Sequence, residues 1–367
     1  MKTDAQNIRF MLGISLLAVL FMNGLYYMMP YSVINPYEYF SGNELGSFQV
    51  LNIFIGGTVM PLVALTAGYM LDHHRHLGIV RLGKVHVLLL ILGTMQTVFI
   101  FAFDLLPGLV LMGLVALPFL WTKSFVALIS AVILFGFHLT VTVASGYFSN
   151  AGGPTDVIYS AVQEMNEYSS IFKGMDYFAI IGLNIEIFTQ DLISRIYELI
   201  FTVLPFILAG IAVSKFNIAE VMRESQILTL ILFMALTGSG ITLKLVQVLT
   251  LGSFLGTLIA DNFGGMMLTF GYFVLLLFLT MILPQRVRRV FEVPGEKIIT
   301  IYIIANIILF LVFYGIGFGL YGEVSVGIMV MITLSVYIFL LLLSHLMRRL
   351  NITGIEHLFT KDSDNDA

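Results

Sequence analysis

The sequence contains no cysteine and carries little charge. The absence of cysteine among its 367 residues excludes disulfide bonds, catalysis by a thiolate and metal sites with cysteine ligands. Charged residues make up 11% of the chain, against about 25% in a soluble domain. The net charge of −4 is small, so we expect no nucleic acid among the partners.

Motifs for nucleotide and cofactor chemistry are absent as well. The sequence has no Walker loop, no dinucleotide fingerprint and no Ser-His-Asp constellation, which argues against an ATP-driven pump that works alone. His73, His74 and His76 follow Asp72 and could bind zinc, but they lack the His-x-x-x-His spacing of a helix face. We expect a solvated loop there, no metal site and no cofactor.

What the chain does have is long apolar runs. Hydrophobic residues make up 59% of it, and the mean hydropathy is +0.98. A helix needs roughly 20 apolar residues to cross a ~30 Å hydrocarbon core, and lipid satisfies no backbone hydrogen bonds. The fold class is therefore an all-α integral membrane protein. We predict ten spans, at residues 10–30, 48–71, 85–103, 105–121, 124–145, 192–213, 226–247, 265–283, 298–319 and 327–346.

The distribution of lysine and arginine predicts the orientation. Fifteen of the eighteen fall on one side if the N-terminus is cytoplasmic, and the exceptions are Lys173, Arg195 and Lys244. An even number of spans returns the C-terminus to the same side. We predict a single polytopic domain over residues 1–350, a short cytoplasmic tail over 351–367, and a place in the bacterial cytoplasmic (plasma) membrane, surrounded by the lipid bilayer.

Residues 146–191 form one long segment, predicted to lie outside, between five spans over 10–145 and five over 192–346. Its aromatic residues predict packing on the bundle rather than a loose linker; these are Tyr159, Tyr168, Phe172, Tyr177 and Phe178. Five spans in each half would give the halves inverted topology, as in many transporters, although no repeat joins their sequences.

Two predicted spans contain helix-breaking residues. The second contains Gly56-Gly57 and Pro61, and the seventh contains Gly238-Ser239-Gly240. Interruptions at matching positions of two halves indicate a binding site near the membrane midplane. Close helix packing through small residues is the alternative.

Asp104 lies between the third and fourth predicted spans, at the outer mouth of a helical hairpin. It is either a helix cap or a group that binds a proton, a cation or a substrate. Gln96 lies eight residues earlier, just over two helical turns, on roughly the same face. The two residues therefore predict a polar seam.

Other polar residues offer further candidates. His138 is the histidine placed in the middle of a span, as a general base or as a hydrogen-bonded packing residue. Arg195 and Glu198 are spaced to pair on one helix, unless Arg195 faces an anionic substrate group. We expect Lys244 to extend to the outer interface. Asn23, Asn52 and Asn306 are each predicted to bridge helices.

Several short motifs recur in an order typical of one family. They are Gly13 with the apolar run that ends at Asn23, Asn35-Pro36, Leu92-Gly93, Asp104-Leu105-Leu106, Gly113-Leu114, Leu208-Ala209-Gly210 and Gly354-Ile355-Glu356. In these motifs the chain resembles the YeiB-like bacterial membrane proteins, the domain of unknown function 418, over nearly its whole length. That family is distantly similar to transmembrane acyltransferases.

The resemblance implies acyl transfer, but this sequence departs from the family's motifs at positions where that chemistry would take place. The family's Asp-x-x-Arg-Gly becomes Arg9-x-x-Leu12-Gly13, and a histidine of the family becomes Gln96, which cannot titrate. If the protein is an enzyme, we expect a membrane acyltransferase with Asp104 or His138 as the catalytic group. Gln96, Asp104, Arg195 and Asn23 are the predicted substrate-binding residues.

The predicted function is the handling of a lipophilic or acylated small molecule at the outer leaflet, by transport or acyl transfer. The alternative is a non-enzymatic protective or accessory protein, for example one that confers immunity to a membrane-active peptide. Acyl transfer requires that the basic inner segment 284–297 line a cavity for the acyl donor. Transport requires a cavity at the midplane, and a protective protein requires neither.

Overall fold

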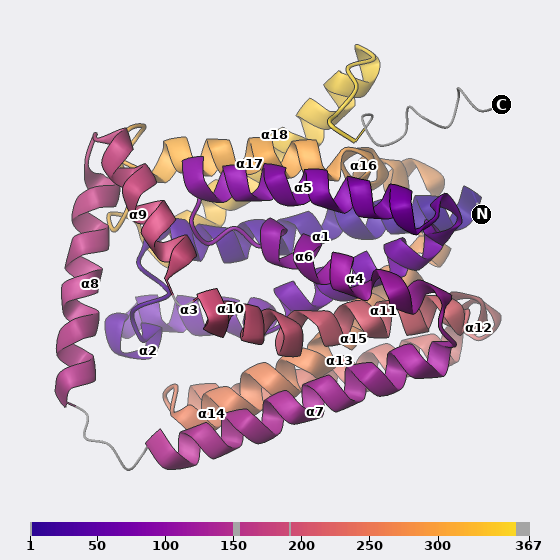
Figure 1. Ribbon diagram of the computed structural model, residues 1–367, viewed down its shortest axis with the longest axis horizontal. Helices are drawn as coiled ribbons and strands as arrows, with labels where there is room; N and C mark the ends of the chain where they lie inside the picture. Colours follow the sequence, from indigo (N-terminus) through magenta and orange to yellow (C-terminus); the bar gives the residue numbers. More distant parts are fainter. Residues whose placement is uncertain (1, 150–154, 191, 357–367) are drawn as a thin grey trace.

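The computed structural model describes residues 2–149, 155–190 and 192–356 (Figure 1). Over these residues the regular structure is helical throughout. Eight helices are long and apolar enough to cross a membrane, and a bent pair of helices adds a ninth if it counts as one span. The predicted all-α integral membrane class is confirmed.

The first half of the bundle comprises α1 (Lys2–Met28), α2 (Pro36–Tyr39), α3 (Gly42–Ile55), α4 (Val59–His73), η1 (Arg75–Leu77), α5 (Ile79–Phe99), α6 (Leu106–Ala116), η2 (Leu117–Trp121) and α7 (Ser124–Ser149). The segment between the halves forms α8 (Thr155–Lys173) and α9 (Tyr177–Thr189).

The second half comprises α10 (Leu192–Glu198), η3 (Leu199–Val203), α11 (Leu204–Lys215), α12 (Ile218–Glu224), α13 (Gln226–Leu249), α14 (Phe254–Leu258), η4 (Ile259–Gly264), α15 (Gly265–Ile282), α16 (Gln285–Glu296), α17 (Ile298–Phe313) and α18 (Val326–Arg349). Of these, η3 and η4 are π-helical turns.

An apolar helix lies at each of the ten predicted spans, but two of these helices are short. The fourth is the pair α6 and η2, Leu106–Trp121, and the ninth is α17, with 16 residues. At 1.5 Å per residue, 16 residues rise about 24 Å, less than the hydrocarbon core. Helix α17 reaches the length of a full span only when α16 is counted with it, and these two helices meet at an angle of 77°.

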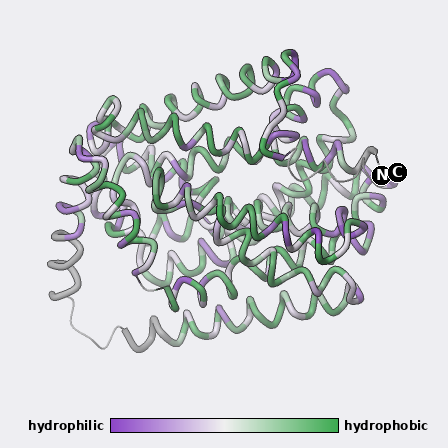
Figure 2. The backbone as a smooth tube through the Cα atoms, turned by 45° about the horizontal axis from the view of Figure 1, so that its top comes forward, coloured by the Kyte–Doolittle hydropathy of each residue, from purple (hydrophilic) through white to green (hydrophobic). Residues whose placement is uncertain are grey.

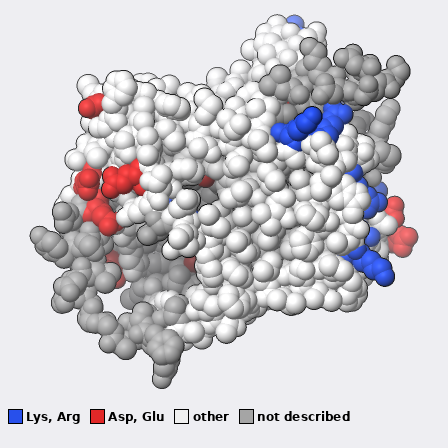
Figure 3. Space-filling view, viewed as in Figure 1, with Lys and Arg blue, Asp and Glu red and all other residues white. Residues whose placement is uncertain are grey.

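Charge is distributed unequally between the two ends of the bundle. The start of α1 and the end of α18 lie toward one end (Figure 1), and on the face in Figure 3 the lysine and arginine side chains gather toward that end, with most acidic ones at the other. Hydrophobic residues dominate between the ends (Figure 2). This arrangement agrees with the predicted side for both termini, and the cytoplasmic assignment itself stays a prediction.

Cysteine labelling tests the orientation without background, because the chain has no cysteine of its own. Ser170 on α8 and Thr353 beyond α18 are both exposed. We expect Ser170→Cys, and equally Ser160→Cys, to react with a membrane-impermeant maleimide on intact cells, and Thr353→Cys to react only after permeabilisation. The reverse pattern would overturn the predicted orientation.

The segment between the halves packs on the bundle largely as predicted. Tyr168 and Phe172 are buried, and the Phe172 ring stacks on Tyr314 with centroids 4.4 Å apart. The Tyr177 hydroxyl donates to the Phe99 carbonyl at 2.9 Å. The prediction was wrong for Phe178, which is 82% exposed. The side chain of Tyr159 lies outside the described part of the chain.

Helices α4 and α11 cross with their backbones in contact. A Cβ atom on Gly68 would lie 1.9 Å from the Ile207 carbonyl oxygen, and one on Gly210 would lie 2.0 Å from the Leu65 oxygen. Only glycine fits at either position, because any side chain would push the two helices apart. This crossing holds the first and second halves of the bundle together.

We therefore expect Gly68→Ala to destabilise the protein by about 1–3 kcal/mol, the usual range for overpacking. Gly238→Ala is the matched control, since nothing lies within 4 Å of its Cβ position and alanine favours the helix by up to about 1 kcal/mol. Thermal unfolding in detergent, followed by circular dichroism, measures both changes. Equal melting temperatures for the two variants would contradict the close crossing.

The two predicted interruptions have different outcomes. The second span is broken between α3 and α4, where Gly57 adopts the left-handed conformation with φ of +56°. In the seventh span the structure has the close packing and not the interruption. Helix α13 runs through Gly238 and Ser239 without a break, and a Cβ on Gly240 would lie 3.0 Å from the Leu268 amide nitrogen of α15.

Candidate functional site

Asp104 lies deep in the bundle rather than at its mouth. Its Oδ1 accepts hydrogen bonds from the Tyr302 hydroxyl at 2.5 Å and from the Leu106 amide at 2.9 Å. Tyr302 is eleven residues from the end of α17 at Phe313, so Asp104 lies about 16 Å inside that end. The predicted interfacial position was therefore wrong, although the contact with Leu106 is the expected cap.

The chain reaches this depth because residues 100–105 turn back into the bundle after α5. Side chains of α9 bind the last carbonyls of α5: Asn184 donates to Val98 and Tyr177 donates to Phe99. Phe101 is fully buried and stacks on Tyr27 with centroids 4.1 Å apart. Burial of this ring, together with satisfied helix-end carbonyls, stabilises the return.

Three further residues complete what we call the Asp104 cluster: Asn23, Tyr27 and Asn306, beside Asp104 and Tyr302. Asn23 Nδ2 donates to Asn306 Oδ1 at 2.9 Å, and the Tyr27 hydroxyl donates to the Asn306 carbonyl at 3.0 Å. The predicted bridging roles of Asn23 and Asn306 are confirmed. Tyr302 and Asn306, one turn apart on α17, thus bond to Asp104 and to the polar side chains of α1, respectively.

Gln96 lies near the turn of residues 100–105, and its side-chain nitrogen and oxygen form no hydrogen bond. It is 3% exposed, and neither Nε2 nor Oε1 has a hydrogen-bond partner. Asp104 Oδ2 is also buried without a partner. One turn before Gln96, a Cβ on Gly93 would lie 3.1 Å from the Pro107 nitrogen, so this part of α5 packs on the turn that follows Asp104. A buried polar group without a partner costs about 1–3 kcal/mol, which makes this turn a place where a polar ligand would bind.

A second polar cluster surrounds Lys244, a residue whose position was wrongly predicted from the sequence. Lys244 is 1% exposed and donates to Asp261 Oδ1 at 2.5 Å, so the predicted extension to the interface was wrong. Nearby, Asn52 donates to Gln247 at 2.9 Å, and Gln247 donates to Thr257 at 3.1 Å. The predicted bridge by Asn52 is confirmed. We call these five residues the Lys244 cluster.

The sequence contains a pattern that indicates the pairing of Lys244 with Asp261. Lys244 is the only lysine or arginine between Arg223 and Arg286, and Asp261 is the only acid between Glu224 and Glu292. A lone cation and a lone anion in one long apolar stretch lower each other's desolvation cost by pairing. Sequence reasoning missed Asp261 because residues 248–264 were taken as a loop between spans.

The Lys244 cluster adjoins the break between α3 and α4. A Cβ on Gly57 would lie 2.7 Å from the Asp261 carbonyl oxygen, so the break touches the π-helical turn η4. Side chains of α15 bind carbonyls at the break: the Thr269 hydroxyl donates to Thr58, whose carbonyl also accepts from the Leu62 amide, and the Tyr272 hydroxyl donates to Phe54. Unwound backbone inside a membrane bundle persists only when it is satisfied in this way, and π-turns often mark functional sites.

The remaining candidates lie outside these two clusters. His138 Nε2 lies 3.2 Å from Asn262 Oδ1, next to Asp261 in η4, while its Nδ1 is buried without a partner. Arg195 and Glu198 form no ion pair within the described part of the chain. Arg195 lies in α10, at the start of the second half of the bundle.

The histidines after α4 show no metal-site geometry. Over the residues described, no group of three histidine or acidic side chains is arranged to hold a metal ion. Burial lowers the pKa of the His74 imidazole, and its Nδ1 lies 2.9 Å from the Met70 carbonyl. These contacts belong to the end of a helix.

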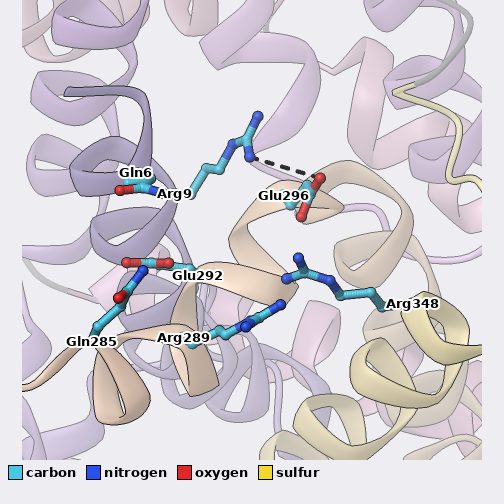
Figure 4. Close-up of a pocket in the computed structure, with 7 residues that line it drawn as sticks. All are labelled: Gln6, Arg9, Gln285, Arg289, Glu292, Glu296 and Arg348. Carbon is cyan, nitrogen blue, oxygen red and sulfur yellow. Dashed lines mark ion pairs between the residues drawn. The ribbon is translucent and has the colours of Figure 1, made fainter. Parts of the chain in front are cut away.

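A pocket of about 230 Å³ lies at the end of the bundle that carries the termini (Figure 4). Its lining residues come from α1, α16 and α18; they are Gln6, Arg9, Gln285, Arg289, Glu292, Glu296 and Arg348. Four of the seven belong to the basic segment 284–297, for which acyl transfer required a cavity. We call this cavity the arginine pocket.

Comparison with known proteins bears on the second half of the chain. Residues 210–359 match a family described as Protein of unknown function (DUF418). Searches of curated proteins and of solved structures gave no match. The matched region includes α13 and η4 of the Lys244 cluster, α17 with Tyr302 and Asn306, and the arginine pocket's α16 and α18. Over residues 210–359 the chain is therefore similar to the family of the domain of unknown function 418.

Proposed function

We propose that this membrane protein handles a lipophilic or acylated small molecule by acyl transfer, with Asp104 as the working group. The observation that carries the proposal is the Asp104 carboxylate, which is bonded to Tyr302 about 16 Å from the end of α17 and has one buried oxygen, Oδ2, without a partner. An acid at membrane depth is expensive and is a functional candidate by default. A helix cap alone would not require this depth.

The arginine pocket favours acyl transfer over transport. It lies where a water-soluble acyl donor would enter, and it uses the segment that acyl transfer required. Helix α1 links the two sites, since Arg9 lines the pocket and Asn23 belongs to the Asp104 cluster. Asn23 follows Arg9 by fourteen positions, a rise of about 21 Å along the helix, which is a distance that an extended acyl donor can span.

The proposed chemistry uses few groups. An acceptor hydroxyl attacks the carbonyl of an acyl thioester, the C–S bond breaks as the new C–O bond forms, and the hydroxyl proton ends on the released thiol. Asp104 would take that proton in the transition state, as a general base, and Tyr302 would hold the carboxylate in place through its hydrogen bond. Gln96 would orient the polar group of the substrate.

Release of thiol tests the proposal directly. We would reconstitute the protein in nanodiscs and supply coenzyme A thioesters with acyl chains of two to sixteen carbons, together with bacterial lipid or glycan acceptors. Free thiol would be measured with a thiol-reactive chromogenic reagent. The protein contributes no thiol of its own. We expect release above that of empty nanodiscs for one acyl length. No release with any donor would overturn acyl transfer and leave a transporter or a protective protein.

Transport is the second candidate, and the Lys244 cluster favours it. An ion pair beside a broken helix resembles a transporter site, where unwound backbone and helix ends surround a cargo. Flux of a labelled lipophilic substrate into proteoliposomes that Lys244→Met or Asp261→Asn abolishes, while both variants remain folded, would support this candidate. Thiol release that both variants preserve would exclude these residues from the chemistry.

A further inference from the structure

We propose that the arginine pocket binds a phosphate group. Where that group belongs to the acyl donor, the inference rests on the proposed function, and where it belongs to a membrane lipid, the inference stands apart from it. The argument uses the charges of the pocket, its construction and its size.

The charges of the pocket match those of a phosphate monoester. Arg9 pairs with Glu296 at 3.7 Å, and Arg288, which is not a lining residue, pairs with Glu292 at 3.9 Å. Each glutamate is thereby engaged by one arginine. Arg289 and Arg348 form no ion pair with any other described residue, which leaves two uncompensated positive charges. A phosphate monoester carries a charge of about −1.5 to −2 near pH 7.

The pocket is also built from rigid parts. Figure 4 shows Arg289 and Arg348 extending toward each other from α16 and α18, while Arg9 on α1 extends toward Glu296, its ion-pair partner. A Cβ on Gly295 would lie 1.8 Å from the Arg9 carbonyl oxygen, so α16 lies directly on α1. Planar guanidinium groups bind phosphate oxygens in pairs of hydrogen bonds, and those of Arg289 and Arg348, from two helices, can bind one phosphate between them.

The size of the cavity indicates a single group rather than a whole molecule. Pockets for drug-sized ligands measure about 300–1,000 Å³, and this one measures about 230 Å³. The bend of 77° between α16 and α17 lays α16 across the end of the bundle. A ligand could therefore place its phosphate here while the rest of it extends along the protein or into the bilayer.

Binding of two probes, each carrying a phosphate monoester, tests the inference in phospholipid-free detergent. Calorimetry with coenzyme A represents a soluble donor, and calorimetry with dihexanoyl phosphatidic acid represents a lipid. We expect at least one probe to bind, with its Kd raised about tenfold by Arg289→Gln and by Arg348→Gln, since each loses a charged hydrogen bond of about 1.5–3 kcal/mol. The tighter probe identifies the source of the phosphate.

The matched controls are Arg286→Gln on α16 and Arg349→Gln on α18, which are exposed and do not line the pocket. Both should bind as the wild type does. If neither probe binds, or if all four variants weaken binding equally, the inference is overturned. If binding depends on Arg289 but no thiol is released, the acyl-transfer proposal alone is contradicted. If thiol is released and Arg289→Gln and Arg348→Gln leave the rate unchanged, the phosphate site alone is contradicted.

Discussion

Lys244→Met should lower the free energy of unfolding by about 1–3 kcal/mol, the typical loss when a hydrogen-bonded buried group loses its partner. The side chain of Lys244 is wholly buried, and its one ion-pair partner in the described structure is Asp261, whose side chain is 35% exposed. Without the ammonium, the Asp261 carboxylate lies beside the broken backbone at Gly57 with no cation to compensate it. Thermal and denaturant unfolding in detergent measure the loss, with Lys84→Met as the control at an exposed lysine of α5.

The double variant separates the pair from the packing of its members. Replacing both charges, as in Lys244→Met with Asp261→Leu, removes the uncompensated carboxylate and should recover most of the lost stability. If Lys244→Met is as stable as Lys84→Met, or if the double variant is less stable than the single one, the ion pair does not stabilise this part of the bundle.

The apolar runs predicted the architecture well because lipid leaves the backbone few alternatives. The bridging asparagines were predictable for a related reason, since a buried amide in a bundle needs a partner. Asn23 and Asn52 do bridge helices, to Asn306 and Gln247. The identity of each partner was not predictable, because it depends on which helices become neighbours.

The depth of Asp104 could not be predicted from hydropathy. The apolar residues on both sides suggested two straight spans with the acid between their ends. The return of residues 100–105 into the bundle depends on the stacking of Phe101 on Tyr27 and on the contacts of α9 with the end of α5. These contacts join residues tens of positions apart, and no local pattern records them.

Glycine in the sequence did not reveal which helices cross closely. Gly68 and Gly210 meet the backbone of a neighbouring helix, whereas Gly238 faces open space. All three lie in apolar stretches of similar composition, so their composition alone does not distinguish them. The break at Gly57 was recognisable because two adjacent glycines weaken a helix. At Gly238-Ser239-Gly240 the sequence left interruption and close packing open, and Gly240 packs closely on Leu268 within an unbroken helix.

Asp104→Asn should abolish activity while leaving the fold intact. Asparagine has the shape of aspartate and can still accept the hydrogen bonds from Leu106 and Tyr302, so we expect the stability to change by less than about 1 kcal/mol. It cannot take a proton, and loss of general base catalysis typically lowers a rate about 10²–10⁴-fold. Tyr302→Phe should have a smaller effect, because it removes only the hydrogen bond that positions the carboxylate.

His138→Ala provides the comparison for the other catalytic candidate. His138 contacts Asn262 beside the Lys244 cluster and makes no contact with the Asp104 cluster among the hydrogen bonds of the described residues. If Asp104 is the base, His138→Ala should retain most of the activity. Loss of activity in folded His138→Ala with full activity in Asp104→Asn would move the chemistry to α7.

The most direct measurement is the rate of thiol release by Asp104→Asn relative to the wild type, per mole of folded protein, in the same nanodiscs. We expect a rate at least about 100-fold lower and a melting curve close to that of the wild type. A rate equal to that of the wild type, together with poor folding of Asp104→Ala, would show that Asp104 is a helix cap and would contradict its role as the working group.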